Sequence, residues 1–177
     1  MTNLVNRTKG FGSGQFVITH VHVRDLENHD TLTVTAGGVL RMEISARAVS
    51  DIRRPNIGFA VNKPDGELIF SISALNLGVR LADLAPGETC RVIFEFEAAL
   101  APGAYPLTVI AADNHEAVTG DSGAHHDTRE RLAILKVAAG SITPAFDGVG
   151  WLGLCVSEDR VLNKIGLTPS NSDYNDR

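Results

Sequence analysis

Two histidines in the first part of the chain have the spacing of a metal-binding pair. His20 and His22 are separated by one residue, and the carboxylate of Glu27 follows shortly after them. On a regular β-strand, residues two positions apart share a face. Imidazole and carboxylate groups held on one face could bind zinc or another divalent metal ion.

The residues around this pair argue against a regular strand. The apolar residues of the stretch alternate but change phase between Ile18 and Val21, which predicts a β-bulge. A bulge would separate the two histidines and leave His22 on an outward, solvated face. A cupin-like metal enzyme also needs a later histidine ligand, yet the turn at Pro102 leads to Tyr105 rather than to a histidine. This class is therefore the weakest of three hypotheses for the function.

Ordinary structure explains the remaining motifs better than chemistry does. His125-His126-Asp127 could bind metal, but within a glycine-containing polar loop over 115–127 it predicts plain polar surface. Gly148–Gly153 matches GxGxxG, which binds dinucleotides only within a parallel βαβ unit, so we interpret these glycines as strand and turn residues. Because no phosphate-binding P-loop and no family-specific Ser/His/Asp or Cys/His spacing occurs, the sequence supports neither an enzyme nor a cofactor.

Composition indicates one ordinary globular domain. The chain has 177 residues, of which 44% are hydrophobic, and a formal net charge of −5. Without a clustered Lys/Arg stripe, this charge argues against nucleic acid or an anionic membrane surface as the main partner. No apolar run approaches the ~20 residues of a membrane span. The two cysteines, Cys90 and Cys155, and the lack of an apolar signal core favour a reducing, cytoplasmic setting.

The clearest structural signal is strict alternation between residues 87 and 97. The apolar residues at every second position are Cys90, Val92, Phe94 and Phe96. This alternation predicts a β-strand with one face buried in the core. A corner follows, in which Gly103 can take a positive φ, and Tyr105 opens the next apolar run. In immunoglobulin-like sandwiches a tyrosine at such a corner packs its ring into the core, and its hydroxyl forms a hydrogen bond with nearby backbone.

Similar signals recur along the chain and define the fold class. A second alternation predicts four inward residues, Leu40, Met42, Ile44 and Ala46. Pro64-Asp65-Gly66 predicts a hairpin turn, and residues 74–86 predict a crossing loop. Seven or eight short strands without a convincing amphipathic helix predict an all-β fold, an antiparallel immunoglobulin-like or jelly-roll β-sandwich.

The sandwich is expected to carry segments at both ends. Residues 1–13 predict a flexible linker, 14–138 the sandwich, 139–156 a linker and C-terminal strand, and 157–177 a polar tail. The apolar stretch 149–156 follows a Gly/Ser/Pro linker, so it could pair with the sheet edge of a second copy. We therefore expect a homodimer.

Taken in order, several motifs resemble one known family. They are Phe11-Gly-Ser-Gly14, Val21-His-Val-Arg-Asp25, Gly38–Ile44, Pro55–Val61, Pro64-Asp-Gly66, Val92-Ile-Phe94 and Leu100–Tyr105. Over about residues 11–140 their order and spacing resemble the C-terminal carbohydrate-binding domain of the ATP-binding subunit of bacterial O-antigen polysaccharide ABC transporters.

The resemblance implies a non-catalytic sandwich that binds the modified non-reducing end of a finished O-polysaccharide, the outer part of lipopolysaccharide, and couples it to export. It also implies dimers that exchange a C-terminal strand, and contact with the transmembrane subunit at the inner face of the inner membrane through the full-length protein. The nucleotide-binding half of the family is absent from this sequence, which leaves an excised domain or a free-standing homologue. The rival hypothesis is a structural or protein-interaction sandwich without a sugar site.

The ligand is expected on one polar sheet face. In immunoglobulin order the strands over 15–24, 39–48 and 89–97 are neighbours, so their outward side chains would form one surface. The candidate ligand-binding residues there are His22, Arg41, Glu43, Ser45, Arg47 and Arg91, with Glu95 beside them. Mixed donors and acceptors suit sugar hydroxyls, and arginine can clamp a carboxylate or phosphate on a capping group.

Two alternatives to this site remain open. The arginines could only balance glutamates across the strands, since exposed ion pairs are common and weak. The site could also lie on a competing face that is flatter and less charged, formed by Asn56, Gly58, Ala60, Asn62, Thr108 and Ile110.

Overall fold

The computed structural model describes residues 3–113, 124–140, 148–150, 155–158 and 161–164 of the chain. Its elements are the 3-10 helix η1 (Leu4–Arg7) and the strands β1 (Phe16–Arg24), β2 (Thr33–Thr35), β3 (Val39–Ala48), β4 (Pro55–Asn62), β5 (Leu68–Ser73), β6 (Thr89–Glu97), β7 (Gly103–Asp113), β8 (Ala124–Ala138), β9 (Cys155–Glu158) and β10 (Val161–Lys164). Within these residues no helix has the length and apolarity needed to cross a bilayer.

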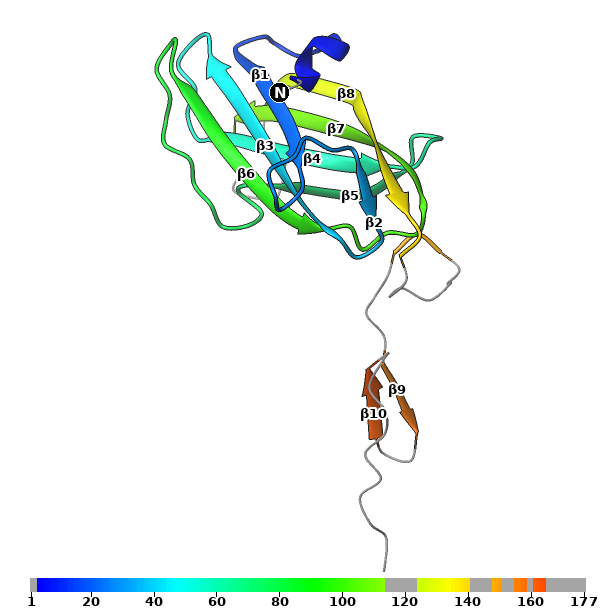
Figure 1. Cartoon of the computed structure of the whole chain (residues 1–177). Helices are drawn as coiled ribbons and strands as arrows, with labels where there is room; N and C mark the ends of the chain where they lie inside the picture. Colours follow the sequence, from blue (N-terminus) through cyan, green and yellow to red (C-terminus); the bar gives the residue numbers. More distant parts are fainter. Residues whose placement is uncertain (1–2, 114–123, 141–147, 151–154, 159–160, 165–177) are drawn as a thin grey trace, which may run out of the picture.

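Two sheets form the body of the molecule (Figure 1). One has the strand order β1-β3-β6, and the other has the order β2-β8-β7-β4-β5. All pairings within them are antiparallel except that of the short β2 with β8, which is parallel. The all-β, immunoglobulin-like sandwich predicted from the alternating strands is thereby confirmed. β9 and β10 pair with each other as a separate antiparallel hairpin.

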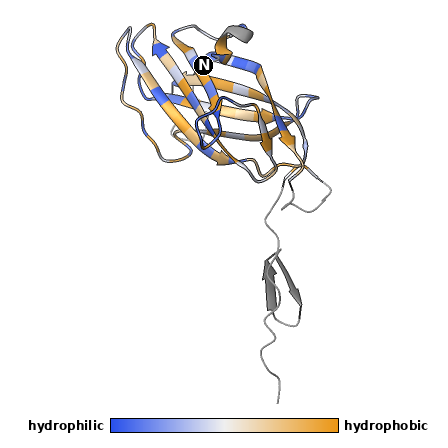
Figure 2. Cartoon of the chain, in the orientation of Figure 1, coloured by the Kyte–Doolittle hydropathy of each residue, from blue (hydrophilic) through white to orange (hydrophobic). Residues whose placement is uncertain are grey.

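The core lies between the two sheets and follows the period-2 pattern of the strands, which Figure 2 shows as alternating hydrophobic and hydrophilic residues. The four residues predicted to face inward on β3 are almost fully buried. Phe94 of β6 is 5% exposed, and its ring meets that of Phe59 of β4 edge-on with centroids 5.2 Å apart. Opposing aromatic side chains thus hold the sheets together with well-packed apolar area.

The corner between β6 and β7 is held by its tyrosine, as the sequence predicts. Tyr105 is 6% exposed, and its hydroxyl donates a hydrogen bond to the carbonyl of Ala101 at 2.8 Å. Burial raises the pKa of this phenol. Gly103 does not take the positive φ that its place in the corner suggested. A Cβ at this position would lie 3.1 Å from the Tyr105 hydroxyl oxygen, so a larger residue would require the tyrosine ring to shift by a few tenths of an ångström.

The N-terminal segment differs from the flexible linker expected over residues 1–13. Leu4 and Val5 of η1 are buried against the core, and Phe11 forms a β-bridge with Thr128. The side chain of Asn3 accepts a hydrogen bond from the Val21 N–H at 3.2 Å and donates one to a neighbouring carbonyl of β1 at 2.8 Å. Residues 3–14, here called the lead segment, therefore cover backbone groups that an edge strand would leave unpaired.

We predict that the inward and outward positions of β6 differ sharply in their effect on stability. Phe94→Ala should lower the free energy of unfolding by about 3–5 kcal/mol, because it removes buried aromatic area and leaves a cavity. Glu95→Ala, at the next and exposed position, should cost less than about 1 kcal/mol. Denaturant unfolding of both variants tests this difference, and equal losses would contradict the assigned faces.

Candidate functional site

The strands β1, β3 and β6 bring all six predicted site residues onto one surface. His22 is paired with Glu43, Ser45 with Arg91, and Arg47 with Thr89 across neighbouring strands. The predicted order of these strands in one sheet is confirmed. We call this surface the polar face and define it by the outward residues His22, Arg41, Glu43, Ser45, Arg47, Arg91 and Glu95.

Most cations of the polar face are paired with an acid. Arg41 Nε lies 2.8 Å from Glu95 Oε2, and Arg91 Nη1 lies 3.7 Å from Glu43 Oε1. Arg47 is exposed and forms no ion pair with any described residue. The surface thus combines donors and acceptors with little net charge, which suits neutral hydroxyl groups better than it suits an isolated anion.

Three residues of this surface were missing from the sequence-based set. Arg24 Nη1 lies 3.5 Å from Glu43 Oε2, so this carboxylate is shared between two arginines. His20 is exposed and lies opposite Ser45. Ile93, 52% exposed, is an apolar residue in the middle of the polar face. Alternation along β6 and along the end of β1 could have revealed Ile93 and Arg24, whereas His20 needed the position of the bulge.

His22 is on the predicted face but is not solvated as predicted. It is only 8% exposed, and its ring stacks on that of His20 with centroids 6.4 Å apart. Its Nδ1 is buried without a hydrogen-bond partner among the described residues, which is a costly arrangement for a polar atom. The alternation of residues along a strand predicts which face a side chain lies on, but it does not predict how much of that side chain its neighbours cover.

The bulge does not separate the two histidines, contrary to the prediction. The register of β1 against β3 shifts between Ile18 and His20, so the irregularity precedes the histidine pair and both rings lie on one side. Among the described residues no third ligand joins them. Only one group of three metal-ligating side chains occurs there, and it consists of Asp25, Glu27 and His29 in the next turn.

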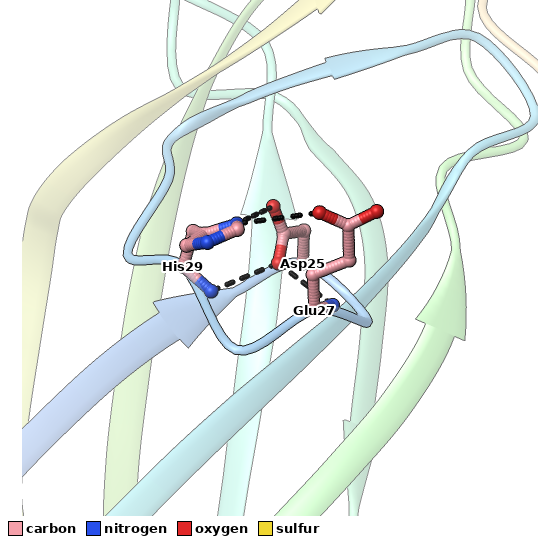
Figure 3. A group of neighbouring side chains, drawn as sticks. All are labelled: Asp25, Glu27 and His29. Carbon is pink, nitrogen blue, oxygen red and sulfur yellow. Dashed lines mark hydrogen bonds and ion pairs between the residues drawn. The ribbon is translucent and has the colours of Figure 1, made fainter.

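The Asp25 group is occupied by the hydrogen bonds of its own turn (Figure 3). Asp25 Oδ1 accepts the backbone N–H groups of Glu27 and His29, both at 2.9 Å. The His29 backbone hydrogen bond is the largest cause of the lowered Asp25 pKa. His29 Nδ1 lies 3.3 Å from Asp25 Oδ2 and 3.6 Å from Glu27 Oε2. These contacts are those of an Asx-type turn between β1 and β2.

The structure assembles one serine, histidine and aspartate that the sequence did not connect. Ser13 Oγ lies 2.6 Å from Nδ1 of the buried His126, and Nε2 of that ring lies 3.3 Å from Asp113 Oδ2 without the alignment of a hydrogen bond. Backbone hydrogen bonds join the same segments, including Gly14 N–H to the His126 carbonyl at 2.8 Å. We interpret the group as a clamp that fixes the lead segment on β8.

The adjoining Asp127 was predicted as loop surface, and this was wrong. β8 begins at Ala124, and the side chain of Asp127 is 5% exposed. Its Oδ2 accepts the N–H of Ile18 at 2.9 Å, and Arg129 Nε donates to its Oδ1 at 2.9 Å. Arg129 Nη1 also donates to the carbonyl of Thr8 at 2.8 Å. One buried ion pair therefore connects β8, β1 of the other sheet, and the lead segment.

We predict that this ion pair is a major determinant of stability. Asp127→Ala should lower the free energy of unfolding by about 3–5 kcal/mol, because it leaves the Arg129 guanidinium buried without its acid. Glu130→Ala, at an exposed neighbour that forms no ion pair with any described residue, should change stability little. Denaturant unfolding with matched m-values provides the comparison. A cost of less than about 1 kcal/mol for Asp127→Ala would show that the pair is dispensable.

The competing face offers fewer free polar groups than its composition suggests. Asn56 Nδ2 donates to Ser73 Oγ at 3.1 Å, and Asn56 Oδ1 accepts the Leu75 N–H at 3.2 Å. Asn62 Nδ2 donates to the carbonyl of Gly66 at 3.2 Å. The amides of this face are thus engaged in hydrogen bonds to neighbouring segments.

The only free cysteine with a described side chain, Cys90, has its pKa raised by burial to about 11, so its thiol is protonated at neutral pH.

Comparison with known proteins agrees with this architecture. The model of the family described as Wzt C-terminal domain matches residues 7–152. The crystal structure of the C-terminal domain of wzt superposes with a TM-score of 0.73 at 18% identity, covering 85% of this chain and 88% of the other. A Niemann-Pick type C2 protein from Japanese carpenter ant gives a TM-score of 0.52 at 8% identity, covering 74% and 98%. A search of curated proteins found no match.

The two sheets and their strand order define an immunoglobulin-like β-sandwich. The chain belongs to the Wzt C-terminal domain family, whose model spans most of its length. The family resemblance carried by the ordered sequence motifs is thereby confirmed. Membership supports a carbohydrate-binding role in O-antigen ABC transport.

Proposed function

We propose that this domain recognises the modified non-reducing terminus of an O-antigen polysaccharide and couples it to export by an ABC transporter. The observation that carries the proposal is the convergence of His22, Arg41, Glu43, Ser45, Arg47 and Arg91 on the polar face of a family whose role is carbohydrate binding. In this proposal the domain acts at the cytoplasmic side of the inner membrane, through a full-length protein that contacts the transmembrane subunit.

The chemistry of the polar face supports recognition of sugar hydroxyls. Arg41 and Glu95 are 39% and 55% exposed, so their hydrogen-bonding groups remain partly accessible although they form an ion pair. Ile93 supplies an apolar contact between them and Arg91, where the C–H face of a sugar ring can pack. Since β3 and β6 pair without a register shift, and β1 pairs with β3 in one register beyond its bulge, the side chains are presented by a sheet rather than by loops.

We predict that arginines of the polar face carry the affinity for an end-capped O-antigen glycan. Arg41→Ala or Arg91→Ala should weaken binding more than tenfold, about 1.4 kcal/mol, because each removes hydrogen bonds to the ligand. Isothermal titration calorimetry measures this effect. Lys136→Ala serves as the charge-matched control because Lys136 is an exposed cation on β8, outside the polar face.

The opposite result would relocate the site. Unchanged affinity in both arginine variants, with loss in Asn56→Ala or Asn62→Ala, would move it to the competing face. Each variant requires a melting curve, because the asparagine side chains also hold neighbouring segments.

We also propose a homodimer that uses the C-terminal segment. β9 and β10 are strands beyond the sandwich, and Val149 lies against the core while Gly150 bridges to Leu100. A chain ending at Thr143 should lose the dimer because it lacks these strands, and light scattering on both chains measures the change. A monomeric full-length chain, or a dimer that survives truncation, would contradict the proposal.

The rival function as a protein-interaction sandwich has one specific observation in its favour. Five exposed apolar side chains occur on the edge strand β5 and in the loop that follows it, namely Leu68, Phe70, Leu75, Leu77 and Val79 at 57%, 47%, 39%, 59% and 51% exposure. Exposed apolar groups beside an edge strand are typical of protein contacts. Glycan-array binding distinguishes the two functions, because only the carbohydrate-binding domain should retain defined glycans.

A further inference from the structure

A cleft of about 330 Å³ lies between the start of β4 and the loop that follows β5. Its lining includes the two arginines Arg54 and Arg80, the amide of Asn56, and the apolar side chains Leu75, Val79 and Leu81. We call it the Arg54 cleft. It lies away from the polar face, since β4 and β5 belong to the other sheet.

The positive charges of the Arg54 cleft are not paired with acids, unlike most of those on the polar face. No acidic residue belongs to its lining, and within the described residues neither Arg54 nor Arg80 forms an ion pair. Asp83 also contacts this segment, but its Oδ1 accepts the backbone N–H of Arg54 at 2.8 Å rather than pairing with a guanidinium. On a chain of net charge −5, two unpaired cations at one cleft mark a place where an anion is favoured.

The walls of the cleft are fixed by hydrogen bonds. The side chain of Asn56 forms hydrogen bonds with the Ser73 hydroxyl and the Leu75 N–H, which fix the loop after β5 against β4. On the other side, Ile52 and Leu84 exchange backbone hydrogen bonds at 2.9 Å in both directions. Arg54 itself has a φ of 50°, a left-handed conformation that is uncommon for a side chain of this size. Such strain persists only where the surroundings enforce it, and it frequently accompanies binding sites.

The apolar wall restricts the kind of anion that fits. Leu75 and Val79 are 39% and 51% exposed, so a bare inorganic ion would leave their surface in water. A ligand that pairs an oxyanion with a ring bearing C–H groups would contact both the guanidinium groups and the aliphatic side chains. The volume is within the range of small-ligand sites and accommodates a single ring with its acidic substituent.

We propose that the Arg54 cleft binds an acidic sugar residue, with its carboxylate or phosphate held between Arg54 and Arg80 and its ring against Leu75 and Val79. That the ring is a sugar rests on the proposed function, whereas the oxyanion site rests on the cleft alone. The domain then has two separate recognition surfaces, the polar face for hydroxyl groups and the Arg54 cleft for a charged group.

The test is a titration of the full chain with four probes, namely glucuronic acid, glucose 6-phosphate, inorganic phosphate and glucose. Binding is followed by the shifts of backbone amide signals in two-dimensional NMR. The two acidic sugars should shift the amides of Arg54, Leu75 and Arg80 saturably, phosphate should do so more weakly, and glucose should leave them unchanged. The pair of acidic sugars distinguishes a carboxylate from a phosphate preference.

Charge-removing variants provide the second arm. Arg54→Gln and Arg80→Gln should each weaken binding of the better acidic sugar at least tenfold. Arg53→Gln is the matched control, because Arg53 is an exposed arginine at the adjacent position and does not line the cleft. The wild-type shifts alone decide the proposal where a variant fails to fold.

Three outcomes would overturn the proposal. They are an absence of saturable shifts at the cleft, equal shifts with glucose, and an equal loss of affinity in Arg53→Gln. Calorimetry with the end-capped glycan separates this proposal from the proposed function. If the glycan binds through the polar face but acidic sugars do not shift the amides of the cleft, only the proposal for the cleft is contradicted. If acidic sugars bind the cleft but the domain has no affinity for the glycan, only the proposed function is contradicted.

Discussion

The buried carboxylate of Asp127 is the interaction on which the rest of the structure depends. It accepts the Ile18 N–H of β1 while it pairs with Arg129 on β8, so it joins one sheet to the other by a directional contact. Apolar packing between sheets is strong but tolerates sliding, whereas a charged hydrogen bond to one N–H fixes a position. Arg129 then fixes the lead segment through the carbonyl of Thr8. These contacts keep the lead segment in the place where it covers the edge of β1.

Period-2 patterns made most of the sandwich predictable from the sequence. Alternation in β3 and β6 assigned their inward residues correctly, and the corner residues anticipated the Tyr105 hydrogen bond. That the candidate site residues share one surface was predictable to the same extent, because the outward residues of paired strands lie on one face. Burial of His22 and pairing of Arg24 with Glu43 were not predictable, since they depend on how long side chains lie across a sheet.

The contacts of Asp127 and His126 escaped prediction for a different reason. A polar stretch flanked by glycine predicts a loop, because polar residues are usually exposed. Here Ser13 of the lead segment contacts His126, and the Ile18 N–H of β1 is accepted by Asp127, so partners more than a hundred residues away in sequence make burial tolerable. Local patterns contain no information about such distant partners. At the start of β8 a short polar run precedes a long apolar strand. The alternation of residues does not show whether such a polar run is a loop in solvent or the beginning of the strand, buried under a terminal segment.

The position of the β1 bulge connects this core ion pair to the candidate site. The register shift lies between Ile18, which Asp127 holds, and His20, so residues beyond it keep one phase along β1. His20, His22 and Arg24 consequently share the outer side of the sheet with Glu43 and Arg91. A shift of one residue later would turn His20 to the opposite side of the sheet. His20 therefore lies on the polar face because the register shift falls just before it, next to the residue whose N–H Asp127 accepts.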